Sequence, residues 1–253
     1  MKKKIGKEPF IVLLVFVIIG VAIGGVYIYR KNSARNALAA RIAELSPGGA
    51  PPETIEELRE AIDLYEQMIE QHVRDAAQTG IYWKILATRL QDRGLHNEAL
   101  EALERTIYYY PEDPTPHYLT GLSAGVVAKS VHDFGVTGEN TLRQRYYRLS
   151  EESYLRAIEL DGRYARPMYG LAVLYVYELD RPEDAIPYLH RYLELRTRDT
   201  DAMFILATAY YLTGEFEPAL EQYDRILAVT NDAARRDAAE RNKQEILDLL
   251  YGL

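Results

Sequence analysis

The chain has 253 residues, of which 48% are apolar and 27% charged, and it contains no cysteine. These proportions are typical of a folded globular protein, and the lack of cysteine excludes disulfides, thiolate catalysis and cysteine-ligated zinc. The formal net charge is −8, and an acidic protein is repelled by phosphate backbones, so no nucleic acid partner is expected.

A run of uncharged residues, 10–29, follows the N-terminus and ends before Arg30 and Lys31. A helix of this length spans about 30 Å, the thickness of the hydrocarbon core of a bilayer. The run also exceeds the roughly 7 to 15 apolar residues of a cleaved signal peptide. We therefore expect residues 1–31 to form a cytoplasmic tip and a single transmembrane signal anchor, which enters the lipid bilayer through residues 10–29.

The orientation of this anchor depends on the basic residues at its two ends. Four lysines lie within the first seven residues, and the far side has a similar number of basic residues spread over a longer stretch. The compact cluster favours a cytoplasmic N-terminus, so the remaining chain is predicted to be extracytoplasmic, or periplasmic, at the cytoplasmic membrane. The alternative is a domain that faces the cytoplasm.

Gly20 and Gly24 have the spacing that lets two membrane helices approach closely, which would make a homodimer. The alternative is that these residues reflect the general abundance of glycine in membrane helices.

Residues 32–53 are expected to form a stalk and a hinge, because 46–52 contain three prolines and two glycines. Residues 54–79 are predicted to form a leading helix. Its apolar residues recur every three or four positions, which indicates one buried face; they are Ile55, Leu58, Ile62, Tyr65, Ile69 and Val73. Without residues 1–31, the chain has 24 basic and 37 acidic residues, a formal net charge of −13.

From about residue 80 onward, helical stripes follow one another, separated by short breaks at Gly, Asp or Pro. No segment alternates with the period of a strand. The expected fold class is therefore all-α.

Residues 83–111 combine Trp83, a Leu-Ala pair at 86–87, Gly94, Ala99 and Pro111, and residues 203–231 repeat much of this pattern. The pattern resembles the tetratricopeptide repeat. The resemblance implies a right-handed superhelical solenoid of helix pairs, with four repeats over 80–231, an insertion near 126–142 and a C-terminal capping helix at 232–253.

Small residues in these repeats are expected where two helices cross closely. By the resemblance these are Ala87, Gly121, Ala172 and Ala207. Gly94 and Gly214 are expected to end the first helices of their pairs in a left-handed conformation.

No catalytic motif accompanies the repeats. The five histidines lack the spacing of metal ligands, and no nucleophile elbow or phosphate-binding glycine loop is present. The sequence thus predicts no catalytic, cofactor or metal site and a protein that is not an enzyme.

The resemblance implies that a partner protein or peptide binds a concave groove formed by the first helices. The matching positions are Lys84, Thr88, Gln91, Asp92, Tyr118, Leu122, Arg166, Tyr169, Val173, Val176, Tyr177, Phe204, Thr208, Tyr211 and Leu212. Such an aromatic groove suits an apolar peptide, an amphipathic helix or a sugar face. The alternative is that many of the tyrosines only fill gaps between helices.

The insertion at 126–142 is a second candidate contact region, with His132, Asp133 and Phe134 as its loop residues. The alternative is that its apolar start lengthens the preceding helix, which would leave residues 132–140 as the loop. The resulting functional hypothesis is a membrane-anchored scaffold that binds partner proteins in envelope protein assembly or translocation. The alternatives are a glycan-binding anchor for the cell wall and a cytoplasm-facing adaptor.

Overall fold

The structure is a computed structural model that describes residues 54–131 and 141–252. The predicted tip, membrane anchor, stalk and hinge, the glycine pair Gly20 and Gly24, and the loop residues His132, Asp133 and Phe134 all lie outside the described residues. Among the described helices, none combines the length and the apolar character needed to span a bilayer. The chain divides into two compact units, Met1–Asp75 and Ala76–Leu253, with the boundary inside the first described helix.

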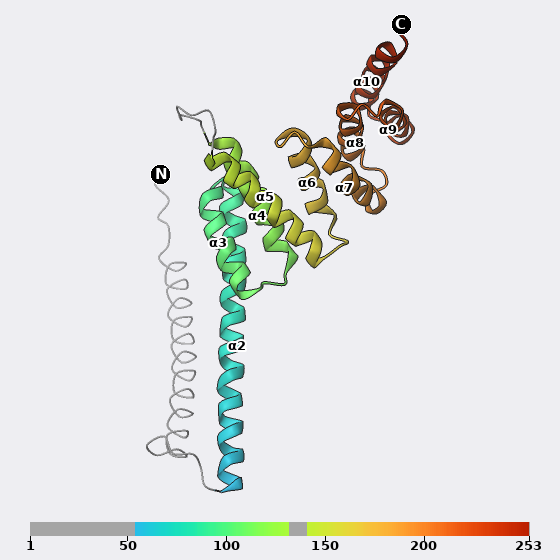
Figure 1. The fold of residues 1–253 in the computed structure, drawn as a ribbon. Coiled ribbons are helices and arrows are strands. Elements are labelled where there is room, and N and C mark those ends of the chain that lie inside the picture. The colour runs from blue at the N-terminus through green and yellow to red at the C-terminus, as the bar shows by residue number, and fades with distance from the viewer. Residues whose placement is uncertain (1–53, 132–140, 253) are drawn as a thin grey trace, which may run out of the picture. The chain divides into compact units, whose positions relative to one another are not determined.

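The described residues form a succession of helices, without a strand among them (Figure 1). The helices are α2 (Ile55–Asp92), α3 (His96–Tyr109), α4 (Pro114–Ser130), α5 (Thr141–Leu160), α6 (Ala165–Tyr177), α7 (Pro182–Leu195), α8 (Thr200–Leu212), α9 (Phe216–Val229) and α10 (Ala233–Tyr251). The predicted all-α class is thus confirmed. The apolar start of the insertion lengthens α4 as far as Ser130, as the second interpretation expected.

The predicted break between a leading helix and the first repeat is wrong, because α2 is one helix of 38 residues. Gly80 does not interrupt it. A Cβ atom at Gly80 would lie 2.5 Å from Cε2 of Tyr110 and 2.7 Å from Cβ of Tyr109. The glycine therefore permits the end of α3 to approach α2 closely, and the helix continues through it.

The prediction of a buried face over residues 54–79 is also wrong. Ile55 is 64% exposed and Val73 61%, and the apolar residues between them at the same spacing are also exposed. In the second unit, α3 ends at Tyr109, and the Tyr110 hydroxyl donates a hydrogen bond to the carbonyl of Ala77 at 2.6 Å. Apolar periodicity indicates which face a helix can bury, but it does not show whether another helix covers that face.

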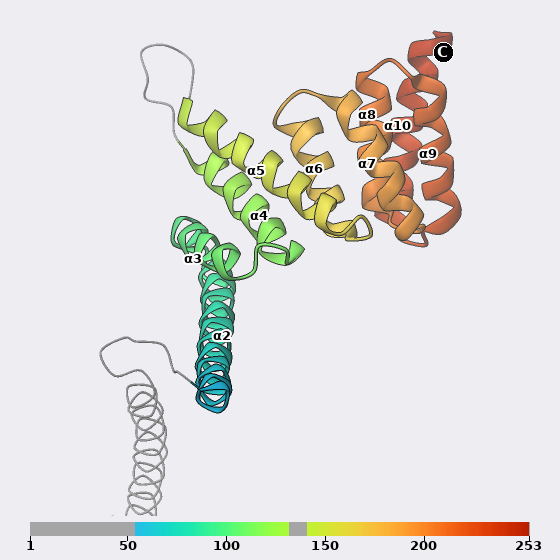
Figure 2. The same ribbon diagram turned by 60° about the horizontal axis from the view of Figure 1, so that its bottom comes forward.

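The helices of the second unit pack as successive pairs. α4 packs on α5, α6 on α7 and α8 on α9, while α3 contacts α4, α5 contacts α6 and α7 contacts α8. The first helices α4, α6 and α8 also contact one another in order, and Figure 2 shows α6 between α5 and α7. Residues from α4 to α10 share one hydrophobic core, and a smaller cluster around Ala87 and Leu103 joins α2 to α3.

Small residues lie at the helix crossings, as the repeat pattern predicted. Ala87, Ala172 and Ala207 are fully buried, and Gly121 is buried against the ring of Tyr154. The predicted left-handed caps are confirmed, because Gly94 has a φ of 74° and Gly214 a φ of 78°.

The turn between α6 and α7 has no glycine at this position. Asp180 adopts the left-handed conformation instead, with a φ of 52°. Aspartate tolerates this region better than most residues.

Hydrogen bonds from aspartate side chains begin several of these helices. Asp113 accepts from the backbone nitrogen of Thr115 at the start of α4, and Asp199 and Asp232 accept from backbone nitrogens at the starts of α8 and α10. Each cap satisfies backbone donors that a helix leaves free at its N-terminus.

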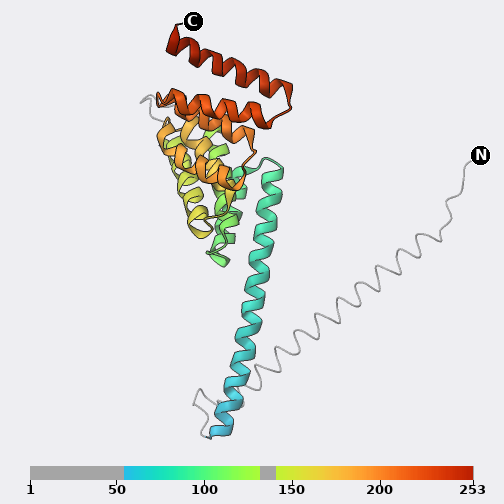
Figure 3. The ribbon, with the colours of Figure 1, turned by 90° about the vertical axis from the view of Figure 1, so that its right-hand side faces the viewer.

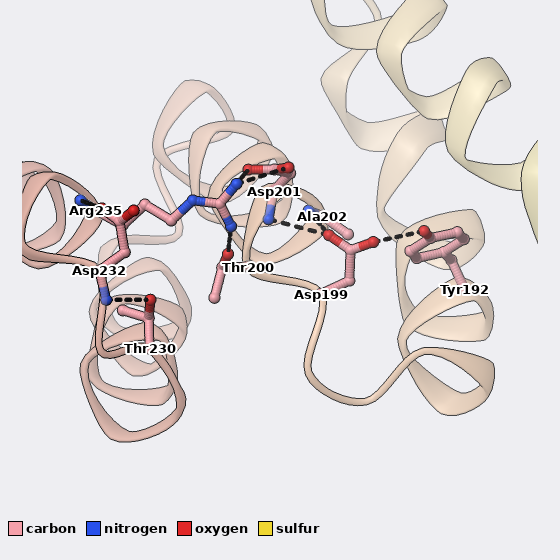
Figure 4. A network of polar contacts seen from close by, with 8 residues as sticks. All are labelled: Tyr192, Asp199, Thr200, Asp201, Ala202, Thr230, Asp232 and Arg235. Atoms are coloured by element: carbon pink, nitrogen blue, oxygen red, sulfur yellow. Dashed lines mark hydrogen bonds and ion pairs between the residues drawn. The ribbon is translucent and has the colours of Figure 1, made fainter.

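α10 packs on α9 at the end of the array (Figure 3). It is also joined to α8, because the Arg235 guanidinium donates to the Thr200 hydroxyl and forms an ion pair with Asp201 at 3.0 Å. Asp199 extends this network by accepting from the Tyr192 hydroxyl of α7 at 2.6 Å (Figure 4). The C-terminal helix thus covers the last repeat through both apolar and polar contacts.

Candidate binding site

A cavity of about 310 Å³ lies between α4, α5 and α6. Its lining is mostly apolar and aromatic, with charged residues at its edge. The lining residues are Tyr118, Leu122, Gly125, Val126, Lys129, Tyr147, Ser150, Tyr154, Arg166, Tyr169, Gly170, Val173, Leu174 and Glu178. We call this cavity the α4–α6 pocket.

The α4–α6 pocket contains the buried ring of Tyr154, which is only 5% exposed. Two glycines make room for this ring: an added Cβ atom would lie 2.6 Å from the ring at Gly121 and 2.7 Å from it at Gly170. Burial raises the pKa of the Tyr154 phenol well above its usual value. Tyr154 is therefore a neutral, buried part of the wall.

The walls of the pocket offer apolar side chains to solvent. Leu122 and Val126 of α4 are 38% and 40% exposed, and Val173 of α6 is half-buried on the same cavity. Exposed apolar side chains that border a concave pocket are a common feature of binding sites. An apolar group that enters here can exchange water contacts for contacts with these three residues.

The acidic residue at the pocket is neutralised by its neighbours. Glu178 pairs with Nζ of Lys129 at 2.5 Å and accepts a hydrogen bond from the Tyr147 hydroxyl at 2.6 Å. Burial, together with the hydrogen bond to Glu178, raises the pKa of Tyr147 to about 12. Glu178 consequently offers little attraction to a cationic ligand.

Arginine side chains give the site its second chemical character. Arg166 lines both the α4–α6 pocket and an adjoining shallow depression of about 290 Å³, which Arg163 and Arg196 also line. Within the described part of the chain, these three guanidinium groups form no ion pair with a carboxylate. They form a small basic surface on an otherwise acidic body, and such a surface favours a carboxylate or another anion.

The structure brings together five of the predicted groove positions. Tyr118, Leu122, Arg166, Tyr169 and Val173 all line the α4–α6 pocket. The two tyrosines are also packing residues, since Tyr118 contacts the rings of Tyr154 and Tyr164, and Tyr169 contacts the ring of Tyr192.

Other predicted groove residues stabilise the repeats and do not line this pocket. Lys84 pairs with Asp113 at 2.6 Å, and Gln91 donates to the Ser123 hydroxyl at 2.7 Å, which ties α2 to α4. Thr88 and Asp92 are exposed on α2.

The predicted positions near the C-terminal end are likewise separate from the pocket. The Phe204 ring packs against Tyr223 and the Tyr211 ring against Phe216, while the Thr208 hydroxyl bonds the carbonyl of Phe204. Tyr177 is 55% exposed and Leu212 51%, whereas Val176 is buried at 5%, so the assignment of Val176 to the groove is wrong.

Residues of α5 and glycines at the crossings were missed by the sequence analysis. The repeat pattern places a groove on first helices, so Tyr147 and Ser150 of the second helix α5 were not considered. The small residues Gly125 and Gly170 lie on first helices and line the pocket. The position of Gly170, two residues before Ala172, was a usable signal of close approach, because a Cβ atom there would lie 2.7 Å from the Tyr154 ring.

The described residues include no cluster of His, Asp or Glu side chains placed to hold a metal ion. The α4–α6 pocket is therefore best regarded as a site for an organic group with apolar and anionic parts.

Comparisons with known proteins support the tetratricopeptide repeat assignment. Residues 177–241, from the end of α6 to the middle of α10, match the tetratricopeptide repeat family. A TPR repeat-containing protein of Borreliella burgdorferi is 20% identical over 224 residues, which cover 88% of this chain and 92% of that protein.

Solved structures show the same helical repeat fold. MamA from Desulfovibrio magneticus superimposes with a TM-score of 0.52 and 15% identity, over 69% of this chain and 96% of that one. A thermophilic TPR protein of Thermus thermophilus superimposes with a TM-score of 0.50 and 19% identity, over 82% of this chain and 97% of that one. The array is thus an all-α helical repeat solenoid like those of tetratricopeptide repeat proteins.

Proposed function

We propose that this tetratricopeptide repeat array is a scaffold that binds a segment of a partner protein at the α4–α6 pocket. The segment carries a bulky apolar side chain next to an acidic group. The observation that carries the proposal is the apolar pocket that ends at Arg166, a cation without a carboxylate partner among the described residues.

The pocket volume indicates what kind of group enters. At about 310 Å³, the cavity is at the lower end of the range of about 300 to 1,000 Å³ that small-molecule sites occupy. It holds one large side chain or one turn of a peptide. Burial of a Leu or Phe side chain contributes about 1.5 to 3 kcal/mol, so useful affinity requires additional contacts along the neighbouring helices.

The basic surface supplies the specificity. Arg166 lines the pocket and, together with Arg163 and Arg196, the adjoining depression, whereas Glu178 at the pocket is paired with Lys129. A guanidinium binds a carboxylate through paired hydrogen bonds, and it does so in preference to neutral groups. A partner with an acidic residue beside its apolar anchor is favoured, and a basic partner is disfavoured.

A glycan is a poorer fit to the same site. Sugar recognition uses the open face of an aromatic ring. The rings of Tyr118 and Tyr169 are engaged with Tyr154, Tyr164 and Tyr192. The available surface of the pocket is formed mainly by aliphatic groups, which suit a protein side chain.

The proposal includes attachment to the cytoplasmic membrane through residues 10–29, with the repeats on the extracytoplasmic side. The uncharged run and the lysines that precede it support this arrangement. In that position the scaffold acts in the assembly or translocation of envelope proteins.

Photocrosslinking in intact membranes tests this function. A photoreactive amino acid replaces Val126 at the rim of the pocket or, as a control, Leu249, which is 60% exposed on α10. We expect a polypeptide to be captured from position 126 only, and this capture to be lost when Leu122→Glu is added. Equal capture at both positions, or a peptidoglycan fragment as the captured molecule, would refute the proposal.

A further inference from the structure

The first unit of the structure has an exposed apolar stripe on α2. Ile55, Leu58, Ile62, Tyr65 and Ile69 are between 41% and 64% exposed, and Val73 extends the line. Isolated apolar residues on a surface are common, but a continuous line along one helix face marks an interaction surface. We call residues 55–73 of this face the α2 stripe.

The spacing within the α2 stripe is that of a coiled coil. The first five residues are separated by 3, 4, 3 and 4 positions, which is the strict alternation of heptad positions a and d. Isoleucine occupies each a position, Ile55, Ile62 and Ile69. A narrow seam of this kind fits one partner helix, whereas a helix buried in a globular core has a wider apolar face.

The length of the stripe limits the partner. After Ile69 the next a and d positions hold His72, Ala76 and Thr79, which breaks the apolar seam. Trp83 and Leu90 return to the same positions, but they pack in the cluster that α2 forms with α3. A second helix therefore has only residues 55–73 available. This run of about 27 Å corresponds to between two and three heptads.

The charges beside the stripe distinguish between orientations. Arg59 and Glu66 occupy successive e positions, both are exposed, and neither has an ion pair within the described part of the chain. In a parallel pair of two copies, e faces g, which would place Glu66 opposite Ala61 and Arg59 opposite Thr54. In an antiparallel pair e faces e, so that Arg59 of each copy faces Glu66 of the other.

We propose that the α2 stripe binds the same stripe of a second copy of this chain, as a short antiparallel coiled coil. Ile62 of one copy packs on Tyr65 of the other at the centre of the seam. Arg59 and Glu66 form two equivalent ion pairs across it.

The seam is short, so the pairing is weak in dilute solution. A stable interface usually covers about 800 Å² on each partner, which is more than two to three heptads provide. A common membrane anchor would hold the copies in one plane and raise their effective concentration. Association is therefore concentration-dependent.

Sedimentation equilibrium of the full chain in density-matched detergent tests the charge pairing. Arg59→Glu and Glu66→Arg each place like charges opposite one another twice, and each is expected to raise the Kd about tenfold. The combined Arg59→Glu, Glu66→Arg variant restores opposite charges and is expected to return within about threefold of wild type. Gln67→Glu, on the opposite face of the helix, serves as the control and leaves the Kd unchanged.

The orientation is tested by disulfide crosslinking, because the natural chain has no cysteine. The Arg59→Cys, Glu66→Cys double variant is expected to form covalent dimers on oxidation. Arg59→Cys alone is expected to form none. Within one helix these two positions are about 10 Å apart, too far for an internal disulfide.

Three outcomes would overturn the proposal. The first is a chain that stays monomeric at every concentration, which would show that the stripe does not pair with itself. The second is a dimer that survives Ile62→Glu and is lost on Gly20→Leu, which would assign association to the membrane segment. The third is efficient crosslinking of Arg59→Cys alone, which would indicate parallel helices.

Discussion

Replacement of Gly121 by alanine is expected to destabilise the array because it forces a methyl group into the Tyr154 ring. The new Cβ would lie 2.6 Å from Cδ1 and 2.7 Å from Cε1 of that ring. The ring cannot retreat freely, because it is 5% exposed and packs with equal closeness on Gly170. Extra volume in a packed core costs about 1 to 3 kcal/mol.

The chain offers a matched control one helical turn further along α4. A Cβ atom at Gly125 would have Oγ of Ser150 as its nearest neighbour, at 3.4 Å, which is an ordinary contact. Alanine in a helix interior is more favourable than glycine by about 1 kcal/mol. Gly125→Ala should therefore stabilise by about 0.5 to 1 kcal/mol, whereas Gly121→Ala should destabilise by about 1 kcal/mol after the same gain is subtracted.

Urea unfolding followed by circular dichroism measures both changes. Tyr154→Leu removes the ring, so Gly121→Ala in that background should lose most of its cost. The two single variants must differ in sign. If Gly121→Ala were as stable as Gly125→Ala, the assigned crossing of α4, α5 and α6 would be wrong.

Three further predictions concern charge, backbone conformation and alkaline stability. Burial alone would raise the pKa of Asp113, but the hydrogen bonds from Lys84 and Thr115 lower it below its usual value. The ionised Asp113 carboxylate therefore adds to the free energy of unfolding above pH 4, and this contribution is lost as the pH falls through the pKa of the folded state. In urea titrations, Asp113→Ala should lower the free energy of unfolding by about 1 kcal/mol at pH 7, and by less in acid. A Cβ atom added by Gly214→Ala would have no neighbour within 4 Å, but the residue would still need a φ of 78°. Thermal unfolding should therefore show a stability lower by about 1 to 2 kcal/mol, and an unchanged Tm would contradict the left-handed cap. Burial and Glu178 raise the pKa of Tyr147 to about 12. The neutral phenol therefore contributes fully to the free energy of unfolding below pH 10, and this contribution is lost as the pH rises toward 12. Tyr147→Phe should reduce the loss of stability at alkaline pH in unfolding titrations, and a pH profile identical to that of the wild type would contradict this prediction.

The repeat fold was predictable because its packing rules are local. A small residue at a helix crossing, a glycine in the left-handed region and an apolar stripe every three to four residues are all readable along the chain. Gly94, Gly214 and Ala207 carried this information, and the structure places each as expected. Each short helix of the array buries its apolar face against the helix next to it in the chain. The residue pattern of one helix pair is therefore enough to predict the contacts within that pair.

The pocket was only partly predictable, because three helices form it. Positions on α4 and α6 followed from the repeat, but the contribution of Tyr147 and Tyr154 depends on how α5 lies between them. The exposed α2 stripe was misjudged for a related reason. Periodicity shows that Ile62 lies on an apolar face, but it does not show whether another helix covers that face.

Peptide selection followed by titration tests the proposed binding function most directly. Peptides are selected from a random library on the wild-type protein, and the Kd of the strongest binder is measured by calorimetry. The account predicts a bulky apolar residue beside an acidic one, with a Kd at least about tenfold higher for Leu122→Glu and about fivefold higher for Arg166→Ala, and no change for Leu249→Glu. Peptides without this pattern, or with the same affinity for wild type and Leu122→Glu, would contradict the claim that the α4–α6 pocket binds a protein partner.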